Sequence, residues 1–209
     1  MTGSHTPPLT PRLLLSAYMQ GYFPMGDPET GEVGWYSPDP RGHLPLDAFH
    51  MPASLRRTVR RGVFEVRCDT AFEEMMRQCA RPRPTQPDTW INEEIIAAYV
   101  QLHRRGWAHS VEAWRDGRLV GGLYGVSIHA AFFGESMFSR PDLGGTDASK
   151  VCLVALVEHL RARGYTLLDT QFVNDHLAQF GCVAISREEY LRRLDEALRR
   201  ASVSWGTWT

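Results

Sequence analysis

The sequence of 209 residues has almost no lysine and no long hydrophobic run. Lys150 is the one lysine among 23 basic residues, and the formal net charge of −1 gives no overall positive field that would attract nucleic acid. No apolar run approaches the roughly 20 residues that a membrane-spanning helix needs. Residues 1–11 are polar and rich in proline, unlike a signal peptide. We therefore expect a cytoplasmic protein that has no membrane partner.

The signatures of several chemical classes are also missing. The four cysteines form no C-x-x-C pair and no Cys/His cluster with zinc-like spacing, so we expect four free, mostly buried thiols in a reducing compartment. Neither a Walker loop nor a G-x-G-x-x-G motif is present, which argues against ATP hydrolysis and dinucleotide binding. The nucleophile motif G-x-S-x-G is absent as well.

Hydrophobic periodicity predicts an α+β fold with two parts. Residues 1–62 are expected to form a small N-terminal domain, with a helix near residues 13–18, short strands among Gly, Pro and aromatic residues, and a basic helix near residues 54–61. Residues 63–209 are expected to form a second domain, whose elements follow in the order β-α-α-β-β-β-α-β-α-α.

Two local signals define the sheet of this second domain. Asp116-Gly117 is a strong signal for a hairpin between two strands. Residues 131–169 have the pattern of one right-handed β-α-β crossover, which antiparallel strands surround. This order is typical of acyltransferase-like α/β folds, among them the Gcn5-related acetyltransferases, but a fold alone does not determine the reaction.

The strand at residues 131–138 carries a carboxylate among aromatic residues. A buried charge is costly unless it is paired, so Glu135 either forms a salt bridge with an arginine or recognises an amine or hydroxyl group of a ligand beside an apolar pocket. Strict alternation along the strand would place Glu135 on the same face as Phe133 and Met137.

The next strand, at residues 165–169, ends in polar side chains. Such strand ends often carry binding sites, and the i, i+2 spacing of Asp169 and Gln171 would place both side chains on one face, where they contact one ligand or each other. Asn174 or Asp175 could cap the helix that follows. His176 is either a packing or surface histidine or a base.

Two further groups of residues could contact nucleic acid. Four arginines at helical spacing form either a solvated charged face or a phosphate-binding surface: Arg56, Arg57, Arg60 and Arg61. Most of the aromatic residues with an exposed pattern are expected in the core, but one or two could stack on a base: Trp35, Tyr36, Trp90, Trp107 and Trp114.

The segment before the crossover helix bears on an acetyl-CoA reaction. Acetyl-CoA enzymes usually carry an R/Q-x-x-G-x-G/A loop there, whose amides bind pyrophosphate at the helix N-terminus. Residues 140–146 read Arg-Pro-Asp-Leu-Gly-Gly-Thr and do not match that spacing. An acetyl-CoA-dependent N-acetyltransferase is therefore the alternative interpretation, and a non-catalytic RNA- or peptide-binding module is a third.

Several segments between residues 13 and 195 follow one another in the order found in a known family: Gly21-Tyr22-Phe23-Pro24, Trp35-Tyr36-Ser37-Pro38-Asp39-Pro40-Arg41, Thr89-Trp90-Ile91, Ala108-His109-Ser110-Val111-Glu112-Ala113-Trp114, Leu119-Val120-Gly121-Gly122-Leu123-Tyr124-Gly125-Val126, Phe133-Gly134-Glu135-Ser136-Met137-Phe138-Ser139, Ala148-Ser149-Lys150 and Asp169-Thr170-Gln171. Together they resemble the bacterial leucyl/phenylalanyl-tRNA–protein transferases. The number of matches in the same order argues against coincidence.

The resemblance implies a small N-terminal domain and an acetyltransferase-like domain, without a metal or nucleotide cofactor. It implies transfer of Leu or Phe, and less well Met, from Leu-tRNA or Phe-tRNA to the N-terminal Arg or Lys of acceptor proteins. The N-end rule then marks these proteins for degradation. We expect a monomer that does not bind DNA.

At matching positions the resemblance also assigns site residues. Asp169 and Gln171 match the catalytic pair, in which we expect Gln171 to position the amine because a neutral amide is a very poor base. Glu135 matches a carboxylate that hydrogen-bonds the donor end. The residues that match the apolar donor pocket are Trp114, Leu123, Phe132, Leu156 and Leu168. The residues that match the tRNA-gripping patch are Arg56, Arg57, Arg60 and Arg61. Met25 replaces a common Trp that packs against the terminal adenosine, so weaker stacking is expected.

Overall fold

The computed structural model of the chain describes residues 8–82 and 88–208. Its helices are α1 (Pro11–Met19), α2 (Ala53–Arg61), α3 (Phe72–Cys79), α4 (Glu93–Arg104), α5 (Ala148–Arg163), α6 (Asp175–Ala178) and α7 (Arg187–Leu198), with a 3₁₀ turn η1 (Pro141–Leu143). Its strands are β1 (Phe23–Gly26), β2 (Val33–Tyr36), β3 (Arg41–His43), β4 (Glu65–Cys68), β5 (Ala108–Arg115), β6 (Arg118–Ile128), β7 (Ala131–Ser139), β8 (Leu167–Gln171) and β9 (Val183–Ile185).

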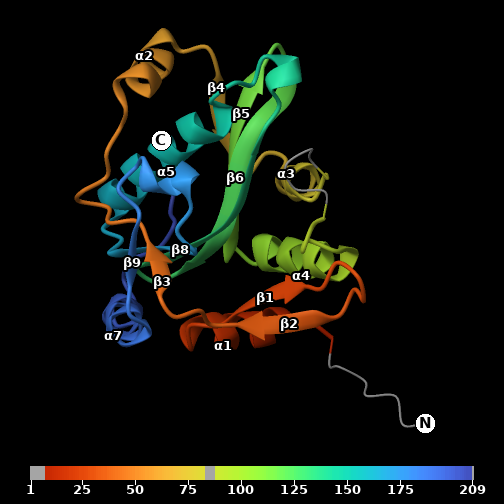
Figure 1. The fold of residues 1–209 in the computed structure, drawn as a ribbon, viewed down its shortest axis with the longest axis vertical. Helices are drawn as coiled ribbons and strands as arrows, with labels where there is room; N and C mark the ends of the chain where they lie inside the picture. The colour runs from red at the N-terminus through yellow and green to blue at the C-terminus, as the bar shows by residue number, and fades with distance from the viewer. Residues whose placement is uncertain (1–7, 83–87, 209) are drawn as a thin grey trace.

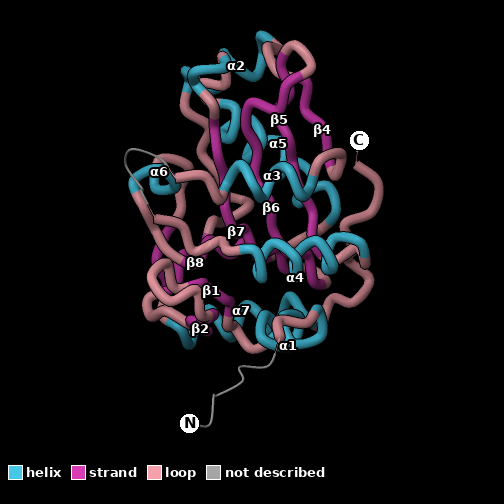
Figure 2. The backbone as a smooth tube through the Cα atoms, turned by 90° about the vertical axis from the view of Figure 1, so that its right-hand side faces the viewer, coloured by secondary structure: helices cyan, strands magenta, loops and turns pink. Residues whose placement is uncertain are grey.

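The predicted α+β class is confirmed. Strands β1 and β2 form a separate hairpin, while seven strands form a mixed sheet in the order β4-β5-β6-β7-β8-β3-β9. Helices α3 and α4 lie on one side of this sheet and α5 on the other (Figure 1). Helix α1 and the β1–β2 hairpin lie at the opposite end of the molecule from α2 (Figures 1 and 2).

Local sequence signals explain several of these elements. Asp116 and Gly117 both have positive φ, 50° and 71°, as a two-residue hairpin turn requires, and they join β5 to β6 as predicted. Asn92 caps α4 by accepting a hydrogen bond from the Ile95 amide at 2.9 Å. The predicted crossover is also present: α5 connects β7 to β8 along the chain, and these two strands pair with each other in parallel.

Two short strands extend the sheet beyond its predicted members. Strand β9 has only three residues, too few to show an alternating pattern, and it was not predicted. Strand β3 comes from the N-terminal side of the boundary predicted at residue 62, yet it pairs with both β8 and β9. Residues 41–43 thus belong to the seven-stranded sheet. The division into two domains at residue 62 stays a prediction.

Each face of the sheet has its own hydrophobic core. Tyr18, Tyr99 and Phe133 belong to the core under α3 and α4, while Leu123 and Leu156 belong to the core under α5. The four cysteines are reduced thiols, three of them buried and Cys68 half-buried, as expected. Within the described residues, no helix has the length and apolar character needed to cross a membrane.

Candidate active site

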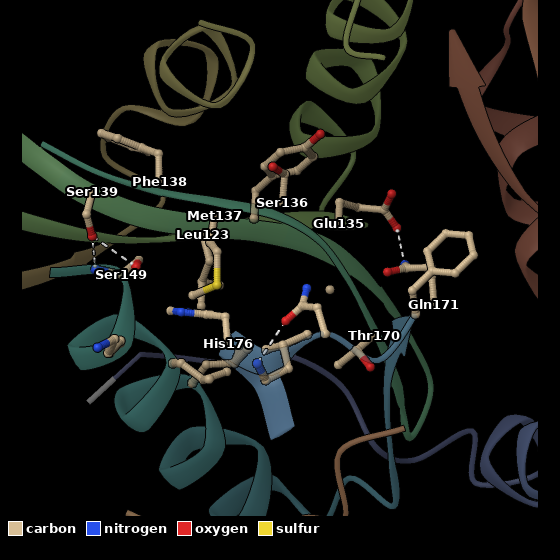
Figure 3. Close-up of a pocket in the computed structure, with 18 of the residues that line it drawn as sticks. Leu123, Glu135, Ser136, Met137, Phe138, Ser139, Ser149, Thr170, Gln171 and His176 are labelled. Atoms are coloured by element: carbon tan, nitrogen blue, oxygen red, sulfur yellow. Dashed lines mark hydrogen bonds between the residues drawn. The ribbon is translucent and has the colours of Figure 1, made fainter. Parts of the chain in front are cut away.

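The site lies where two parallel strands separate. Strands β7 and β8 pair over three residues only, the last pair being Phe133 and Asp169. Beyond this pair a cavity of about 590 Å³ opens between residues 134–139 of β7 and residues 170–172, with α5 contributing one wall (Figure 3). Such a volume lies in the usual range of small-molecule sites, about 300–1,000 Å³.

A β-bulge directs Glu135 into this region. In the β6–β7 register Tyr124 is opposite Ser136 and Gly125 is opposite Gly134, which leaves Glu135 as the extra residue. The bulge shifts the alternation by one residue, so Phe133 and Met137 pack on opposite faces of the sheet. The three residues therefore do not share one face of the strand, contrary to the prediction.

Glu135 is held by polar neighbours rather than by an arginine. Its Oε1 accepts a hydrogen bond from Gln171 Nε2 at 3.3 Å, and its Oε2 accepts one from the Tyr99 hydroxyl at 3.3 Å. The Tyr99 and Tyr18 hydroxyls are hydrogen-bonded to each other. No ion pair involves Glu135 among the described residues. Burial raises the pKa of Glu135 to about 8, although hydrogen bonding by the Tyr18 hydroxyl acts to lower this pKa.

Asp169 and Gln171 do not share a face, contrary to the prediction. Gln171 lines the cavity, whereas Asp169 is fully buried and is not among the lining residues. Gln171 has a left-handed backbone with φ +58°, which breaks the strand alternation at this residue. Asp169 instead pairs with Arg41, whose Nε and Nη2 donate to its two carboxylate oxygens at 3.0 and 2.7 Å.

The cavity wall is mainly aliphatic. Three of the predicted donor-pocket residues, Leu123, Leu156 and Leu168, line it, and Met137 and Leu153 contribute further apolar surface. Figure 3 shows Leu123 and Met137 between the Ser139–Ser149 hydrogen bond at one end and the Glu135–Gln171 contact at the other. A ligand therefore meets an apolar middle and two polar ends.

The other three predicted pocket residues lie outside this lining. Phe132 is opposite Leu168 where β7 and β8 still pair. Its ring stacks on that of Trp205, with 5.4 Å between the ring centres. Trp114 lies on β5, which β6 separates from β7, and its indole donates to Glu112 Oε2 at 3.1 Å. Met25 packs in β1 against the hydrophobic core.

Two buried polar atoms beside the cavity lack a hydrogen-bond partner in the described part of the chain, Tyr124 Oη and His176 Nε2. A buried polar group without a partner is costly, so both atoms are suited to bind a ligand. Burial lowers the pKa of His176, which favours the neutral imidazole. Asn174 caps α6 through the Leu177 amide at 2.9 Å, as one of the predicted alternatives proposed.

The N-terminus of α5 is not prepared for pyrophosphate. The Ala148 amide donates to the Gly145 carbonyl at 3.0 Å, and the Ser149 amide donates to Ser139 Oγ at 3.0 Å. These first-turn amides are the groups with which a helix N-terminus binds an anion. Their internal partners, like the loop sequence, argue against acetyl-CoA as the donor.

Two family profiles match the chain. One, described as leucyl/phenylalanyl-tRNA protein transferase, matches residues 43–195, and the other, described as the N-terminal domain of the same protein, matches residues 8–39. The chain belongs to the leucyl/phenylalanyl-tRNA protein transferase family. The resemblance seen in the sequence and the enzyme class, an aminoacyltransferase, are thereby confirmed.

Individual relatives cover nearly the whole chain. The leucyl/phenylalanyl-tRNA–protein transferase of Paramagnetospirillum magneticum is 55% identical over 206 residues, which are 95% of this chain and 97% of the relative. That of Rubrobacter xylanophilus is 57% identical over 192 residues, 91% and 96% of the two chains. Among solved structures, a ribosomal-protein-alanine N-acetyltransferase from Brucella melitensis biovar Abortus matches with 15% identity and a TM-score of 0.39, covering 56% of this chain and 84% of its own.

In this transferase the four arginines of the expected tRNA patch lie on α2, away from the cavity. Arg56, Arg57, Arg60 and Arg61 are all exposed. None of them forms an ion pair within residues 8–82 and 88–208. The aromatic residues divide: Trp90 lines the cavity, Trp35 and Tyr36 are exposed, and Trp107 and Trp114 pack against the core.

Sequence reasoning missed several residues that shape the site of this transferase. The carboxylate of Asp169 is bound by Arg41 and Tyr190, and that of Glu135 by Tyr99, whose hydroxyl is bonded to that of Tyr18. None of these four neighbours was predicted as a site residue. No spacing in the sequence connects them, since Arg41 and Asp169 lie 128 positions apart. The one local signal is that Arg41 ends a motif shared with the family.

Proposed function

We propose that this chain transfers Leu or Phe, and less well Met, from aminoacyl-tRNA to the N-terminal Arg or Lys of acceptor proteins, which marks them for degradation. The observation that carries the proposal is a cavity with a wall of leucines and a polar end formed by Glu135 and Gln171, in a chain of this family. Leu, Phe and Met suit that wall, whereas a charged side chain would be buried there unpaired.

The reaction needs positioning more than a strong base. The acceptor amine nitrogen attacks the ester carbonyl carbon, the bond from this carbon to the ribose oxygen breaks, and the amine proton passes to that oxygen. Gln171 holds the reactants at the polar end of the cavity. The amine must first lose its ammonium proton, and an α-amino group has a pKa of about 7.7–8.0. Only the ionised form of Glu135 can accept this proton, and a pKa of about 8 makes that form more populated as the pH rises towards 8.

A transfer assay tests the proposal. The protein is incubated with radiolabelled Phe-tRNA or Leu-tRNA and an acceptor protein that begins with Arg, and we expect acid-insoluble label that resists RNase. The same acceptor beginning with Ala is the control and should stay unlabelled. Consumption of acetyl-CoA without label transfer would indicate an N-acetyltransferase. RNA binding without either reaction would indicate a binding module.

The exposed arginines of α2 are proposed to bind the tRNA backbone. Replacing Arg57 and Arg60 by Ala should raise the KM for aminoacyl-tRNA and leave kcat near that of the unchanged protein. Each phosphate contact contributes roughly 0.7–0.9 to the slope of log affinity against log salt, so the slope should fall by about 1–2. Filter binding at several salt concentrations measures it.

The control for this prediction is a second exposed pair of arginines. Arg199 and Arg200 directly follow α7, a helix that lies at the other end of the molecule from α2 (Figure 1). Replacing both by Ala removes the same charge and should leave the salt slope unchanged. An unchanged slope in the α2 variant, or an equal decrease in both variants, would contradict a specific phosphate contact.

The unpaired hydroxyl of Tyr124 is proposed to hydrogen-bond the donor aminoacyl group. Tyr124→Phe should raise the KM for aminoacyl-tRNA by about 5- to 20-fold, because a hydrogen bond to a ligand contributes about 1–2 kcal/mol. Thermal stability should not fall, since the hydroxyl has no described protein partner to lose. An unchanged KM would show that this hydroxyl does not contact the donor.

A further inference from the structure

The carboxylate of Asp169 has every acceptor position occupied. Its Oδ1 accepts from Arg41 Nε at 3.0 Å and from the Gln171 amide at 2.9 Å. Its Oδ2 accepts from Arg41 Nη2 at 2.7 Å and from the Tyr190 hydroxyl at 2.8 Å. Two carboxylate oxygens offer about four lone pairs, so no site remains for a substrate. Asp169 is also fully buried and does not line the cavity.

Arg41 connects this carboxylate to other parts of the fold. Its side chain is fully buried, and its Nη1 donates to the carbonyl of Gly21 at 2.9 Å. The guanidinium carbon lies 4.8 Å from the ring centre of Phe23 and 4.3 Å from that of Tyr190. The segment after α1, the end of β8 and helix α7 are thus fixed relative to one another by one side chain.

Asp169 in turn fixes the backbone of Gln171. The left-handed φ of +58° costs about 1 kcal/mol or more for a residue other than glycine, so the surroundings must enforce it. The hydrogen bond from the Gln171 amide to Asp169 Oδ1 closes a turn of the Asx type that fixes the chain up to this amide. The Phe172 amide then donates to the Thr170 carbonyl at 2.6 Å, which closes a γ-turn around Gln171. In this conformation the Gln171 side chain reaches Glu135 at one end of the cavity (Figure 3).

We propose that Arg41 and Tyr190, acting through Asp169, are positioning residues that aim Gln171 into the site, and that Asp169 does not contact the reactants. The inference deepens the proposed function and rests on it. Asp169 then serves as the hydrogen-bond acceptor that links Arg41 and Tyr190 to the Gln171 amide, and the groups that meet the substrate are Gln171 and Glu135. A reacting Asp169 would instead have to release at least one of its four partners.

A pair of tyrosine variants tests the inference without disturbing the charges. Tyr190→Phe removes the hydrogen bond to Asp169, and Tyr165→Phe is its match, because Tyr165 is also buried and its hydroxyl is bonded to Ser127 Oγ at 2.5 Å. Tyr190→Phe should lower kcat for Phe transfer by about 3- to 10-fold with KM within 2-fold, and Tyr165→Phe should change neither. Equal kcat values in the two variants would overturn the inference.

A charge-neutral double variant separates positioning from proton transfer. Asp169→Asn alone leaves Arg41 unpaired and should lower kcat by about 100-fold or more. Adding Arg41→Met removes that charge, while the asparagine side chain still offers an oxygen to the Gln171 amide. The double variant should therefore regain at least 10-fold over Asp169→Asn, measured where both are folded by circular dichroism. A folded double variant as inactive as Asp169→Asn, in which the side-chain amide signal of Gln171 keeps its position in the unchanged protein, would show that the anion itself reacts and would overturn the inference.

A readout without activity keeps this inference separate from the proposed function. The side-chain amide of Gln171 gives a ¹⁵N–¹H signal in protein labelled at glutamine. That signal should shift in Tyr190→Phe and stay in place in Tyr165→Phe, whether or not the substrate is correct. An unmoved signal in Tyr190→Phe would overturn the positioning role. Absence of label transfer by the unchanged protein would instead overturn the proposed function.

Discussion

Asp169→Ala is expected to lower kcat for aminoacyl transfer by about 100-fold or more. The substitution removes the acceptor that holds the Gln171 amide, so the left-handed turn that aims Gln171 is lost. It also leaves the buried Arg41 guanidinium without its counter-ion, which costs on the order of 3–5 kcal/mol of unfolding free energy. Transfer of labelled Phe should be measured below the melting temperature of the variant, so that the loss of kcat is not a loss of folded protein.

Asp175→Ala is the matched control for this prediction. Asp175 is an exposed carboxylate at the start of α6, four positions after Gln171, and it forms no ion pair in the described part of the chain. Removing an exposed carboxylate usually changes stability by no more than about 0.5 kcal/mol, and kcat should stay within 2-fold. Full activity in a folded Asp169→Ala variant would remove Asp169 from the mechanism altogether.

The parts of the fold that follow from neighbouring residues were predictable. Asp116-Gly117 determines its own hairpin, because both residues tolerate the positive φ that the turn requires. The crossover from β7 through α5 to β8 follows from one apolar helix between two apolar strands. The leucines at positions 123, 156 and 168 were assigned to the pocket by the family resemblance and not by neighbouring residues, and they line the cavity.

The parts that depend on contacts between distant residues were not predictable. One extra residue in β7 exchanges the two faces of the strand, and nothing in the sequence of β7 marks Glu135 as that residue. Alternation likewise assumes extended backbone, so it could not place Gln171, whose φ is positive. Phe132 was assigned to the pocket by resemblance, but it lies in the segment where β7 and β8 are still paired and packs against Trp205.

Glu135→Gln is expected to remove most of the loss of stability with rising pH that the raised pKa of Glu135 predicts. The folded protein raises the pKa of Glu135 from the ordinary 4.5 to about 8, so between these values it holds a proton that the unfolded chain releases. Stability from this group is therefore fully present below about pH 4.5 and is lost as pH rises towards 8. Each pKa unit corresponds to about 1.4 kcal/mol, so the fall between pH 5 and 9 is on the order of 3–5 kcal/mol.

Urea unfolding at pH 5 and pH 9 measures this effect. Glutamine has nearly the same shape and cannot ionise, so the variant should match the unchanged protein at pH 5 and exceed it at pH 9. Glu189→Gln is the control: Arg192 and Arg193 lower the pKa of Glu189, so this substitution should leave the fall with pH in place. The sign of the difference in unfolding free energy between Glu135→Gln and the unchanged protein at pH 9 shows whether ionised Glu135 destabilises or stabilises the fold. If Glu135 were ionised and well paired in the folded protein, Glu135→Gln would be the less stable protein at pH 9, because a favourable charge would have been removed.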